Sequence, residues 1–384
     1  MKVVIIGGGM SGMTAAAMLA RGHDVTLLEA NARLGKKLSA TGNGRCNILN
    51  KNAELEKYNE SAVAEKIVPF YLEKAEAFLE EIGLALAPAD AEDRVYPLTY
   101  NANSVVDCLR AAVEKSGVKV VTGCKAQKIS ENRDGYSVLT DCGVFDADTV
   151  VAAVGSNASS AYCNAEELIG EKFFTKRCPS LAPIIVSDPL PILNGLRHDA
   201  RADLTRGKEK FFSERGEVLF KEYGLSGIVI FNMSAVIARG IVSGKKSEYT
   251  VSLDLFPDTD TAGLEKVLAS RFDKFGQAFA VGLLHNKLAQ ALAVRLGVKT
   301  FERKNLDALA RLLKNLTFVF KGVADKSLAQ VTAGGVDEKI LDGLRIKGTR
   351  IYAIGETLDV DGLCGGYNLY FACASALYLA EHFE

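Results

Sequence analysis

The 384-residue sequence contains no tryptophan and only four histidines, so a metal centre that rests on histidine ligands is not expected. It has eight cysteines, but no two of them form a C-x-x-C pair or show the spacing of zinc ligands. The lack of a close cysteine pair also argues against a disulfide reductase that passes electrons through a dithiol. We therefore expect free thiols, as in a reducing cytoplasm, and no metal.

A surplus of one charge and a long apolar run are also missing. The net charge is -1, which argues against a surface for nucleic acid or for an anionic membrane. No apolar run approaches the ~18 residues of a membrane span, and Asn232 and Arg239 interrupt the closest one, residues 227–242. Hydrophobic residues nevertheless make up 48% of the chain, which is enough for a sizeable core in two or three domains.

The N-terminal segment has the pattern of a strand, a glycine turn, a helix and a second strand. A continuous β-branched run, residues 3–6, predicts a strand that is buried on both faces. Gly7, Gly9 and Gly12 follow in G-x-G-x-x-G spacing, which allows a sharp turn, close approach of the backbone to a pyrophosphate, and close helix packing. Glu29 ends the second strand, where its carboxylate can accept hydrogen bonds from ribose hydroxyls. The pattern therefore predicts a dinucleotide site.

Two features of this segment restrict the alternatives. Its three glycines interrupt the apolar run that follows Lys2, so we reject a secretory signal peptide. Residues 11–21 are instead rich in good helix formers, and the N-terminus of such a helix favours phosphate. The acid at the end of the second strand favours an unphosphorylated ribose, so the segment predicts FAD or NAD before NADP. Nothing within it separates FAD from NAD.

The pattern changes several times along the rest of the chain. Residues 60–82 have helical periodicity, and Pro69 is expected to split or to start this helix. We expect an extended piece at 94–97, a helix capped by Asn103 or Ser104 that ends near Lys115, a strand at 119–122, an antiparallel meander over 126–145 and a strand at 149–154. Later segments are mainly β over 178–255, helical over 261–315, a strand at 350–354 and a helix from about Tyr367.

The terminal strand, glycine turn and helix are similar to the opening unit, so we expect the end of the chain to return to the N-terminal domain. The predicted nucleotide-binding domain is then discontinuous and comprises residues 1–160 and 325–384. A mainly β substrate domain, 161–258 and 316–324, contains a helical insertion, 259–315. The predicted fold class is α/β.

Four segments together resemble one known family. They are the opening glycine unit, GKKLSATGNGRCN at residues 35–47, SLAQVTAGGV at 327–336 and IGETLDVDGLCGGYN at 354–368. This combination resembles the BaiN-like flavoproteins, which are also described as aminoacetone-oxidase-like or NAD(P)/FAD-dependent oxidoreductases. The TGNGRCN and DVDGxxGGYN strings are more specific than the glycine motif, and weaker similarity extends over nearly the whole chain.

The resemblance implies FAD in the first site and a two-dinucleotide-type flavoprotein fold. That fold has a Rossmann-like FAD domain, an inserted β-barrel-like substrate domain and a small helical domain. The cofactor-binding residues that it implies are Gly7, Gly9, Met10, Ser11, Gly12, Glu29, Ala30, Lys37, Thr41, Gly42, Asn43, Gly44, Arg45, Cys46, Asn47, Ala126, Ala153, Val154, Gly155, Gly335, Gly355, Glu356, Asp361, Gly366, Tyr367 and Asn368.

The residue types of the TGNGRCN loop suit this role. Its glycines allow close approach of the backbone, Asn43 and Asn47 supply amide donors and acceptors, and Arg45 can offset the charge of a pyrophosphate. A small packed thiol is the more frequent role for Cys46, and solvation is the more frequent state of a lysine such as Lys37.

The sequence departs from the family at AVGSNASS, residues 153–160, where an A-T-G-G type of turn is usual, so the resemblance implies no contacts beyond Gly155 in this turn. No motif fixes a catalytic residue. Arg94, Tyr96 and Tyr223 are candidates for the pocket only, since tyrosine is often simply amphipathic packing.

Three functions are compatible with these patterns. The first is a flavin reductase that uses NAD(P)H as a transient electron donor and acts on an activated C=C or C=O of a small substrate. The second is a flavin oxidase of a small amine, and the third is a flavin-dependent RNA-modifying protein, against which the near-neutral charge argues. We expect a cytoplasmic protein with no nucleic-acid or membrane partner, for which a homodimer would be unsurprising.

Overall fold

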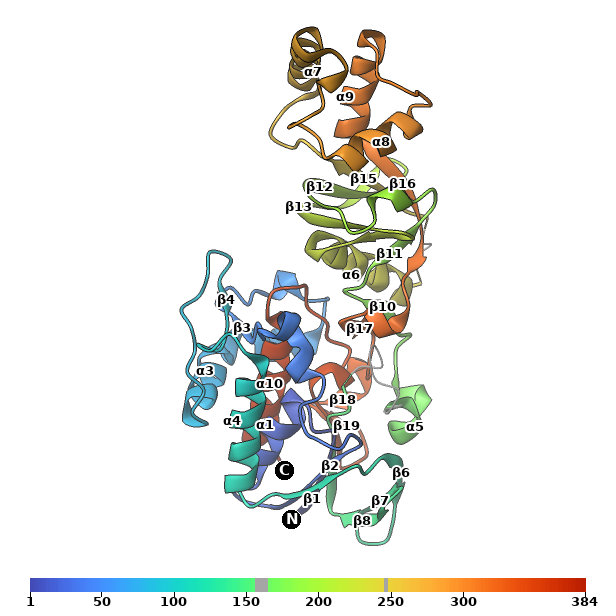
Figure 1. The fold of residues 1–384 in the computed structure, drawn as a ribbon. Coiled ribbons are helices and arrows are strands. Elements are labelled where there is room, and N and C mark those ends of the chain that lie inside the picture. Colours follow the sequence, from blue (N-terminus) through green and yellow to red (C-terminus); the bar gives the residue numbers. More distant parts are fainter. Residues whose placement is uncertain (156–164, 245–247) are drawn as a thin grey trace. The chain divides into compact units, whose positions relative to one another are not determined.

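The computed structural model describes residues 1–155, 165–244 and 248–384 (Figure 1). The chain forms two compact units, of which unit 1 contains Met1–Pro179 and Gln330–Glu384, and unit 2 contains Ser180–Ala329. Each unit is built on its own cluster of buried apolar side chains. The finer division into three domains stays a prediction.

Unit 1 contains a seven-stranded sheet in the order β18-β19-β20-β9-β1-β2-β5. The strands are β1 (Lys2–Ile6), β2 (Asp24–Glu29), β5 (Lys119–Thr122), β9 (Thr149–Ala152), β18 (Leu341–Asp342), β19 (Arg345–Ile346) and β20 (Ile351–Ala353). The five strands from β20 to β5 are parallel. If these five strands are numbered 1 to 5 in the order in which they occur in the chain, their order across the sheet is 5-4-1-2-3. The strand order therefore reverses between β1 and β9. In an α/β sheet, ligands bind beyond the carboxyl ends of the strands at such a point.

Helices α1 (Met10–Leu19), α4 (Ala102–Lys115) and α10 (Tyr367–Glu381) lie side by side against this sheet (Figure 1). Most residues of α1 and α10 are buried, because both helices carry apolar and small side chains around almost their whole circumference. The predicted strands and the N- and C-terminal helices are confirmed, and the two ends of the chain contribute to one Rossmann-type domain.

Smaller elements complete unit 1. Helices α2 (Ala62–Ile67) and α3 (Leu72–Glu81) are separated at Pro69, so of the two predicted roles this proline splits the helical segment. The predicted meander is a three-stranded sheet of β6 (Ala126–Glu131), β7 (Tyr136–Thr140) and β8 (Gly143–Ala147). A short two-stranded sheet pairs β3 (Leu49–Asn50) with β4 (Arg94–Val95), and α5 (Ala165–Ile169) is the remaining helix. The predicted cap of α4 is wrong, because extended Asn101 caps it and accepts a hydrogen bond from the Asn103 N–H.

Unit 2 contains a closed six-stranded barrel, which confirms the predicted barrel-like fold. Around the barrel its strands are β11 (Ile184–Val186), β14 (Gly224–Ser226), β13 (Glu209–Lys221), β12 (Arg197–Arg206), β15 (Thr250–Asp254) and β16 (Leu316–Val323). Buried and more exposed side chains alternate along β15 and β16, because only one face of each strand points into the core. β10 (Cys178–Ser180) and β17 (Val331–Ala333) pair where the chain leaves unit 1 and returns to it.

Helix α6 (Ile228–Val242) corrects the prediction that residues 178–255 are mainly extended. Its run of Val and Ile favours strands, but fifteen residues exceed the usual length of a strand, and burial on several sides offsets the low helix propensity. Asn232 within it donates from Nδ2 to the Glu214 carboxylate at 3.0 Å, which satisfies a polar group in an apolar setting.

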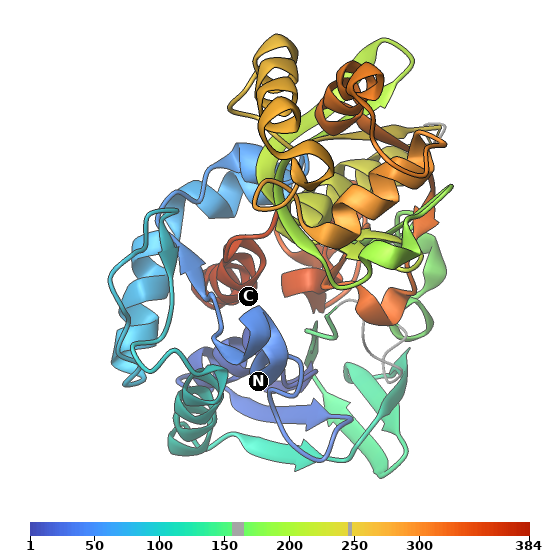
Figure 2. The ribbon, with the colours of Figure 1, turned by 45° about the horizontal axis from the view of Figure 1, so that its top comes forward.

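Helices α7 (Thr261–Phe275), α8 (Asn286–Arg295) and α9 (Leu306–Lys314) lie between β15 and β16 in the chain, as the helical pattern predicts. Both views show them beside the barrel strands (Figures 1 and 2). We call α7, α8 and α9 with their connections the helical layer, residues 261–315. Short 3-10 helices occur at Leu38–Gly44 (η1), Leu55–Lys57, Val68–Phe70, Glu171–Phe173, Pro191–Leu193, Gly276–Ala278 (η6), Arg303–Asn305 (η7), Lys326–Leu328, Glu338–Ile340 and Gly355–Thr357.

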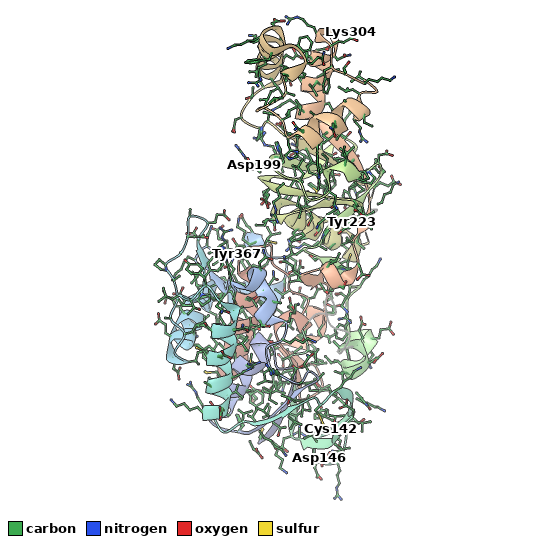
Figure 3. All side chains as sticks on the ribbon, viewed as in Figure 1. Cys142, Asp146, Asp199, Tyr223, Lys304 and Tyr367 are labelled. Atoms are coloured by element: carbon green, nitrogen blue, oxygen red, sulfur yellow. A yellow bond between two sulfur atoms is a disulfide. The ribbon has the colours of Figure 1, made fainter. Side chains whose placement is uncertain are left out.

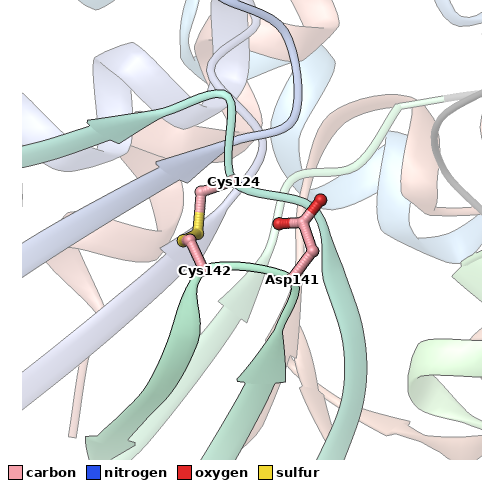
Figure 4. Close-up of side chains that lie close together, drawn as sticks. All are labelled: Cys124, Asp141 and Cys142. Carbon is pink, nitrogen blue, oxygen red and sulfur yellow. A yellow bond between two sulfur atoms is a disulfide. The ribbon is translucent and has the colours of Figure 1, made fainter.

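The expectation that the thiols are free is wrong for one pair, since Cys124 and Cys142 form a disulfide (Figure 4). Folding of the meander brings together two cysteines that are 18 residues apart, a distance at which sequence spacing gives no signal. Asp141 lies beside them, with a carboxylate oxygen within 4.8 Å of both sulfurs. Among the described helices, none is long and apolar enough to cross a membrane.

Candidate functional site

The glycine turn lies where the strand order of the unit 1 sheet reverses. Gly7 has a φ of 108°, and a Cβ there would lie 2.3 Å from the Ala153 carbonyl oxygen at the end of β9. A Cβ on Gly12 would lie only 1.8 Å from the Gly7 carbonyl oxygen. These two positions therefore require glycine, because helix α1, the turn and β9 are in direct contact.

Gly9 differs from its two neighbours in the motif. A Cβ built on it meets no atom of the described residues within 4 Å, so this glycine faces open space. It is also the N-cap of α1, but it provides no side-chain cap, and the first turn contains no acidic residue. Met10 and Ser11 begin that turn. The backbone N–H groups of an uncapped helix N-terminus are a suitable site for an anion such as a phosphate.

Glu29 is buried at the end of β2, and its carboxylate is held in place from two sides. Oε2 accepts a hydrogen bond from the Gly8 N–H at 2.8 Å, and Oε1 accepts from the Asn31 N–H at 2.7 Å. Its carbonyl oxygen accepts from the Cys124 N–H at 2.9 Å. This hydrogen bond places three predicted site residues at the same edge of the sheet. They are Glu29, Ala30, which follows it, and Ala126, which lies two residues beyond Cys124. The sequence analysis did not identify Gly8 or Asn31 as positioning residues.

The TGNGRCN loop, Thr41–Asn47, is an irregular turn within and after η1. Gly42, Asn43, Gly44 and Cys46 have φ values of 57°, 53°, 82° and 57°, so the backbone reverses repeatedly over a few residues. Asn is one of the few residues other than Gly that tolerate such values. The Cys46 side chain is fully buried, and burial raises the pKa of its thiol to about 11. Cys46 is therefore a packed, protonated thiol rather than a reactive thiolate.

This loop contacts the GGYN turn that precedes α10. A Cβ on Gly366 would lie 2.5 Å from the Leu49 carbonyl oxygen and 2.7 Å from Asn47 Oδ1. Asn50 Nδ2 donates to the Gly365 carbonyl oxygen at 2.8 Å. Asn47 Oδ1 is buried and has no hydrogen-bond partner within the described part of the chain, so it remains available as an acceptor.

The ends of β9 and β20 complete the same edge of unit 1. Ala153, Val154 and Gly155 follow β9, and a Cβ on Gly155 would lie 3.7 Å from Glu356 Oε2. A Cβ on Gly355, after β20, would lie 2.6 Å from Ser11 Oγ in α1. The expected departure beyond Gly155 falls on residues 156–160, which lie outside the described ranges.

The structure gives other partners to several residues of the predicted site. Lys37 Nζ forms an ion pair with Glu356 Oε2 at 2.7 Å, so it is not simply a solvated lysine. Asn368 accepts from the Gly362 N–H and donates to the Gly362 carbonyl oxygen, both at 2.8 Å. The Tyr367 carbonyl oxygen accepts from the Tyr58 hydroxyl at 2.9 Å.

Two further predicted residues belong to the same framework. Asp361 is buried and its N–H donates to Asn59 Oδ1 at 3.0 Å, and a Cβ on Gly335 would lie 2.4 Å from the Leu358 carbonyl group. These contacts fix the shape of residues 355–368. Sequence reasoning did not identify Asn59 as the partner of Asp361, because Asn59 lies 302 residues away in the chain and belongs to no motif.

The three pocket candidates belong to different units, since Arg94 and Tyr96 lie in unit 1 and Tyr223 lies in unit 2. Arg94 donates from Nε to Asp90 Oδ2 at 2.8 Å and pairs with Glu92, so its charge is already balanced. Partial burial is the main reason why the pKa of Tyr96 is raised above its ordinary value. Tyr223 lies in the turn between β13 and β14 of unit 2 (Figure 3). Within the described ranges, no acidic or basic side chain is placed so that it would activate one of the three as a proton donor.

The residues on this edge of unit 1 fit an FAD molecule. The open face of Gly9 and the N-terminus of α1 suit a pyrophosphate, and the Glu29 carboxylate suits ribose hydroxyls. The open acceptor of Asn47 and the uncapped N-terminus of α10 lie together at a second point of the same unit. A helix N-terminus there would favour the negative charge that a flavin gains on reduction.

Comparisons with known proteins agree with this description. A family model described as HI0933-like protein Rossmann domain matches residues 1–382. A 3-dehydro-bile acid delta(4,6)-reductase from Clostridium scindens is 31% identical over 99% of this chain and 98% of its own length. A ribosomal RNA dihydrouridine synthase from Escherichia coli is 25% identical over 98% of this chain and 96% of its own.

Among solved structures, a 3-ketosteroid-delta4-(5alpha)-dehydrogenase from Rhodococcus jostii is similar with a TM-score of 0.47 and 13% identity, over 98% of this chain and 96% of that one. The family match over the whole length and the identity to the first relative confirm the resemblance that the sequence motifs indicate. The chain belongs to the HI0933-like Rossmann-domain family and is an FAD-dependent oxidoreductase.

Proposed function

We propose that this protein is a flavin reductase that takes electrons from NAD(P)H and adds hydrogen across a C=C bond conjugated with a carbonyl group. The observation that carries the proposal is what its relatives have in common. One is named as a delta(4,6)-reductase of a 3-dehydro bile acid, and another as a synthase of dihydrouridine. Both names describe saturation of a C=C bond next to a carbonyl group, although the two substrates differ greatly in size and charge.

The residues of unit 1 have defined tasks in this proposal. FAD, when bound, supplies the chemistry by accepting a hydride and passing it on. The open face of Gly9 admits the pyrophosphate, and the N-terminus of α1 balances its charge. Glu29 orients the ribose, and its own position is fixed by the Gly8 and Asn31 N–H groups. Asn47 Oδ1 is free to accept a hydrogen bond from the flavin.

The electron donor is proposed to bind transiently. The sequence contains one complete G-x-G-x-x-G fingerprint preceded by a strand and followed by a helix, and residues 156–330 offer no second one. A permanent second dinucleotide domain is therefore not expected. NAD(P)H would bind next to the flavin, transfer its hydride and leave before the oxidised substrate enters.

A second candidate substrate is a uridine within RNA. Two ribosomal RNA dihydrouridine synthases match nearly the whole chain, with 25% and 22% identity. The bond change is the same as in the first proposal, because uracil contains a C=C bond conjugated with a carbonyl group. The two candidates therefore share the flavin site and differ in what must bind around it.

Reduction of the flavin by different donors tests the proposed function. The purified holoprotein is mixed anaerobically with NADH, NADPH or aminoacetone, and the flavin absorbance band is followed. We expect rapid bleaching by one nicotinamide and a return of the colour when an α,β-unsaturated ketone is added. Bleaching by the amine but by neither nicotinamide would identify an amine oxidase instead. Purified protein that neither carries nor binds flavin would contradict the whole assignment.

A further inference from the structure

The near-neutral charge of the chain conceals a separation of charge between its two units. Residues 180–329 contain 22 Lys and Arg against 16 Asp and Glu, a surplus of six positive charges. The rest of the chain contains 24 Lys and Arg against 31 Asp and Glu, an excess of seven negative charges. Charge asymmetry of this kind between parts of a chain is typical of proteins that bind polyanions.

The positive surplus of unit 2 is concentrated in the helical layer. Residues 261–315 contain ten Lys and Arg against four Asp and Glu, which accounts for the whole surplus of six. The barrel residues of unit 2 are therefore neutral as a group. A cationic surface that is limited to one structural layer is not explained by a general need for solubility, which a dispersed charge would meet equally well.

Several cations of the layer have no acidic partner. Lys266, Lys274, Lys287 and Lys299 are exposed, and no ion pair to any described residue is formed by them. The layer also contains cations that are paired, such as Lys304, which lies 2.7 Å from Glu302. The four lysines are therefore free to bind phosphate groups without breaking an existing ion pair.

Two of these lysines lie at one end of the layer, where separate segments meet. Gln277 Nε2 donates to the Phe301 carbonyl oxygen at 2.9 Å, which joins η6 to the segment before η7. Phe279 and Phe301 pack edge to face with their ring centroids 5.6 Å apart. These contacts bring Lys274 at the end of α7 to the same end as the segment of Lys299. Figure 3 shows Lys304 at the end of the layer that is remote from the barrel.

An exposed aromatic ring lies among these cations. Phe275, the last residue of α7, is 47% exposed. The Lys274 Nζ lies 5.2 Å and the Arg271 guanidinium 5.4 Å from the centre of its ring. An accessible ring next to cations is the combination on which unpaired bases stack while their phosphates are neutralised. A surface that bound only phosphate would not need the ring.

We infer that this end of the helical layer is a docking surface for RNA with unpaired bases. Lys274 and Lys299 contact phosphates, and a base stacks on Phe275. The inference rests on the second candidate of the proposed function, a uridine within RNA, and deepens it by naming the surface that holds the RNA; its test is separate from the flavin chemistry, because binding is measured without any reduction. It differs from the expectation that nucleic acid is not a partner, because that expectation used the charge of the whole chain.

Binding of a fluorescein-labelled, single-stranded RNA of mixed sequence to the holoprotein tests the inference by fluorescence anisotropy at two salt concentrations. The test variant combines Lys274→Glu and Lys299→Glu, and the matched control combines Lys115→Glu and Lys128→Glu on exposed positions of unit 1. We expect the test variant to bind RNA about tenfold more weakly and with a smaller salt dependence, and the control to bind like the wild type. Phe275→Ala should weaken binding by a similar factor at high salt, where stacking contributes most.

Flavin content, melting temperature and bleaching by NAD(P)H are measured for every variant, so a failure of the flavin chemistry is distinguished from a failure of this inference. The inference is wrong if the wild type does not bind RNA, or if the control variant loses as much affinity as the test variant. It is also wrong if the wild type binds vesicles of anionic phospholipid through the same lysines and does not bind RNA.

Discussion

The three glycines of the opening motif have two different structural tasks. Gly7 and Gly12 are required by packing, since a Cβ on either would overlap with a backbone carbonyl oxygen of unit 1. Gly9 is not required by packing, because its α-carbon faces open space. A glycine that the folded protein itself does not need points to a requirement that arises only when a ligand approaches the backbone.

The substitution Gly9→Ala separates these two tasks. The added methyl group fits the protein without overlap, so we expect the melting temperature of the apoprotein to change little. The same methyl group would stand where the pyrophosphate approaches, so the dissociation constant of FAD should rise by about tenfold or more, which corresponds to about 1.4 kcal/mol. Isothermal titration of the apoprotein with FAD measures the change.

Gly22→Ala is the matched control, because a Cβ at Gly22 also meets no atom of the described residues within 4 Å, and Gly22 follows the opposite end of α1. It should leave both FAD affinity and stability unaltered. Gly12→Ala, in contrast, should lower stability as well as FAD binding. A Gly9→Ala protein that binds FAD as well as the wild type would contradict the assignment of this turn to the pyrophosphate.

Side-chain partners at this scale were largely beyond sequence reasoning. The glycine spacing predicts a turn because the need for glycine there arises from residues that are close in sequence, and the structure has that turn. The ion pair of Lys37 with Glu356 joins residues that are 319 positions apart, and no spacing rule can indicate such a pair. Asn368 is predicted to lie next to the cofactor, and the structure shows that its side chain holds the Gly362 turn, a contact that no motif indicates. Its role towards FAD stays a prediction.

At the scale of elements, burial of apolar residues explains what could be predicted. Strands with continuous Val and Ile, and helices with regular apolar spacing, were located to within a few residues. Helix α6 was not recognised, since its β-branched residues favour a strand and only the surrounding core makes the helix stable. The disulfide was missed for a related reason, because the meander that brings Cys124 to Cys142 is itself a tertiary feature.

The disulfide should stabilise the meander and the edge of the sheet beside it. Cys142→Ser removes a cross-link between residues that are 18 positions apart, and the chain-entropy model gives a loss of about 3 kcal/mol in the free energy of unfolding for a loop of this size. Urea denaturation in the absence of reductant measures this loss.

Cys108→Ser is the control for this experiment, since Cys108 is a half-buried free cysteine in α4. It should change the stability much less than Cys142→Ser. Adding a dithiol reductant should lower the stability of the wild type to that of Cys142→Ser and have no further effect on the variant. Equal stability of the wild type with and without reductant would show that the bond does not stabilise the protein.

At the scale of the whole molecule, the chain contains two independent cores. Unit 2 is one continuous segment, Ser180–Ala329, and its barrel is closed, so it has no unpaired strand edge to cover. Its apolar cluster contains residues from the barrel, from α6 and from the helical layer. A segment with a complete core of its own satisfies the usual criterion for a folding domain.

Residues 180–329 should therefore fold when they are expressed alone. We expect a cooperative thermal transition by circular dichroism and dispersed amide signals in an NMR spectrum. A matched segment that ends at residue 315 lacks β16, which pairs with both β11 and β15, so its barrel cannot close and it should not fold cooperatively. If the complete segment also shows no cooperative transition, the two units are parts of a single folding domain.

The position of unit 2 within the chain determines the order in which the flavin site can be completed during synthesis. Unit 2 is made before Gly355, Gly366 and α10, which supply the last parts of the edge that also contains the N-terminal glycine turn. A ribosome that stops just after unit 2 therefore releases a chain with a finished barrel and an unfinished sheet. Such a chain lacks one side of the cofactor site and cannot gain the stability that a bound ligand provides. Cofactor binding in this architecture thus distinguishes chains that extend through α10 from chains that stop before it.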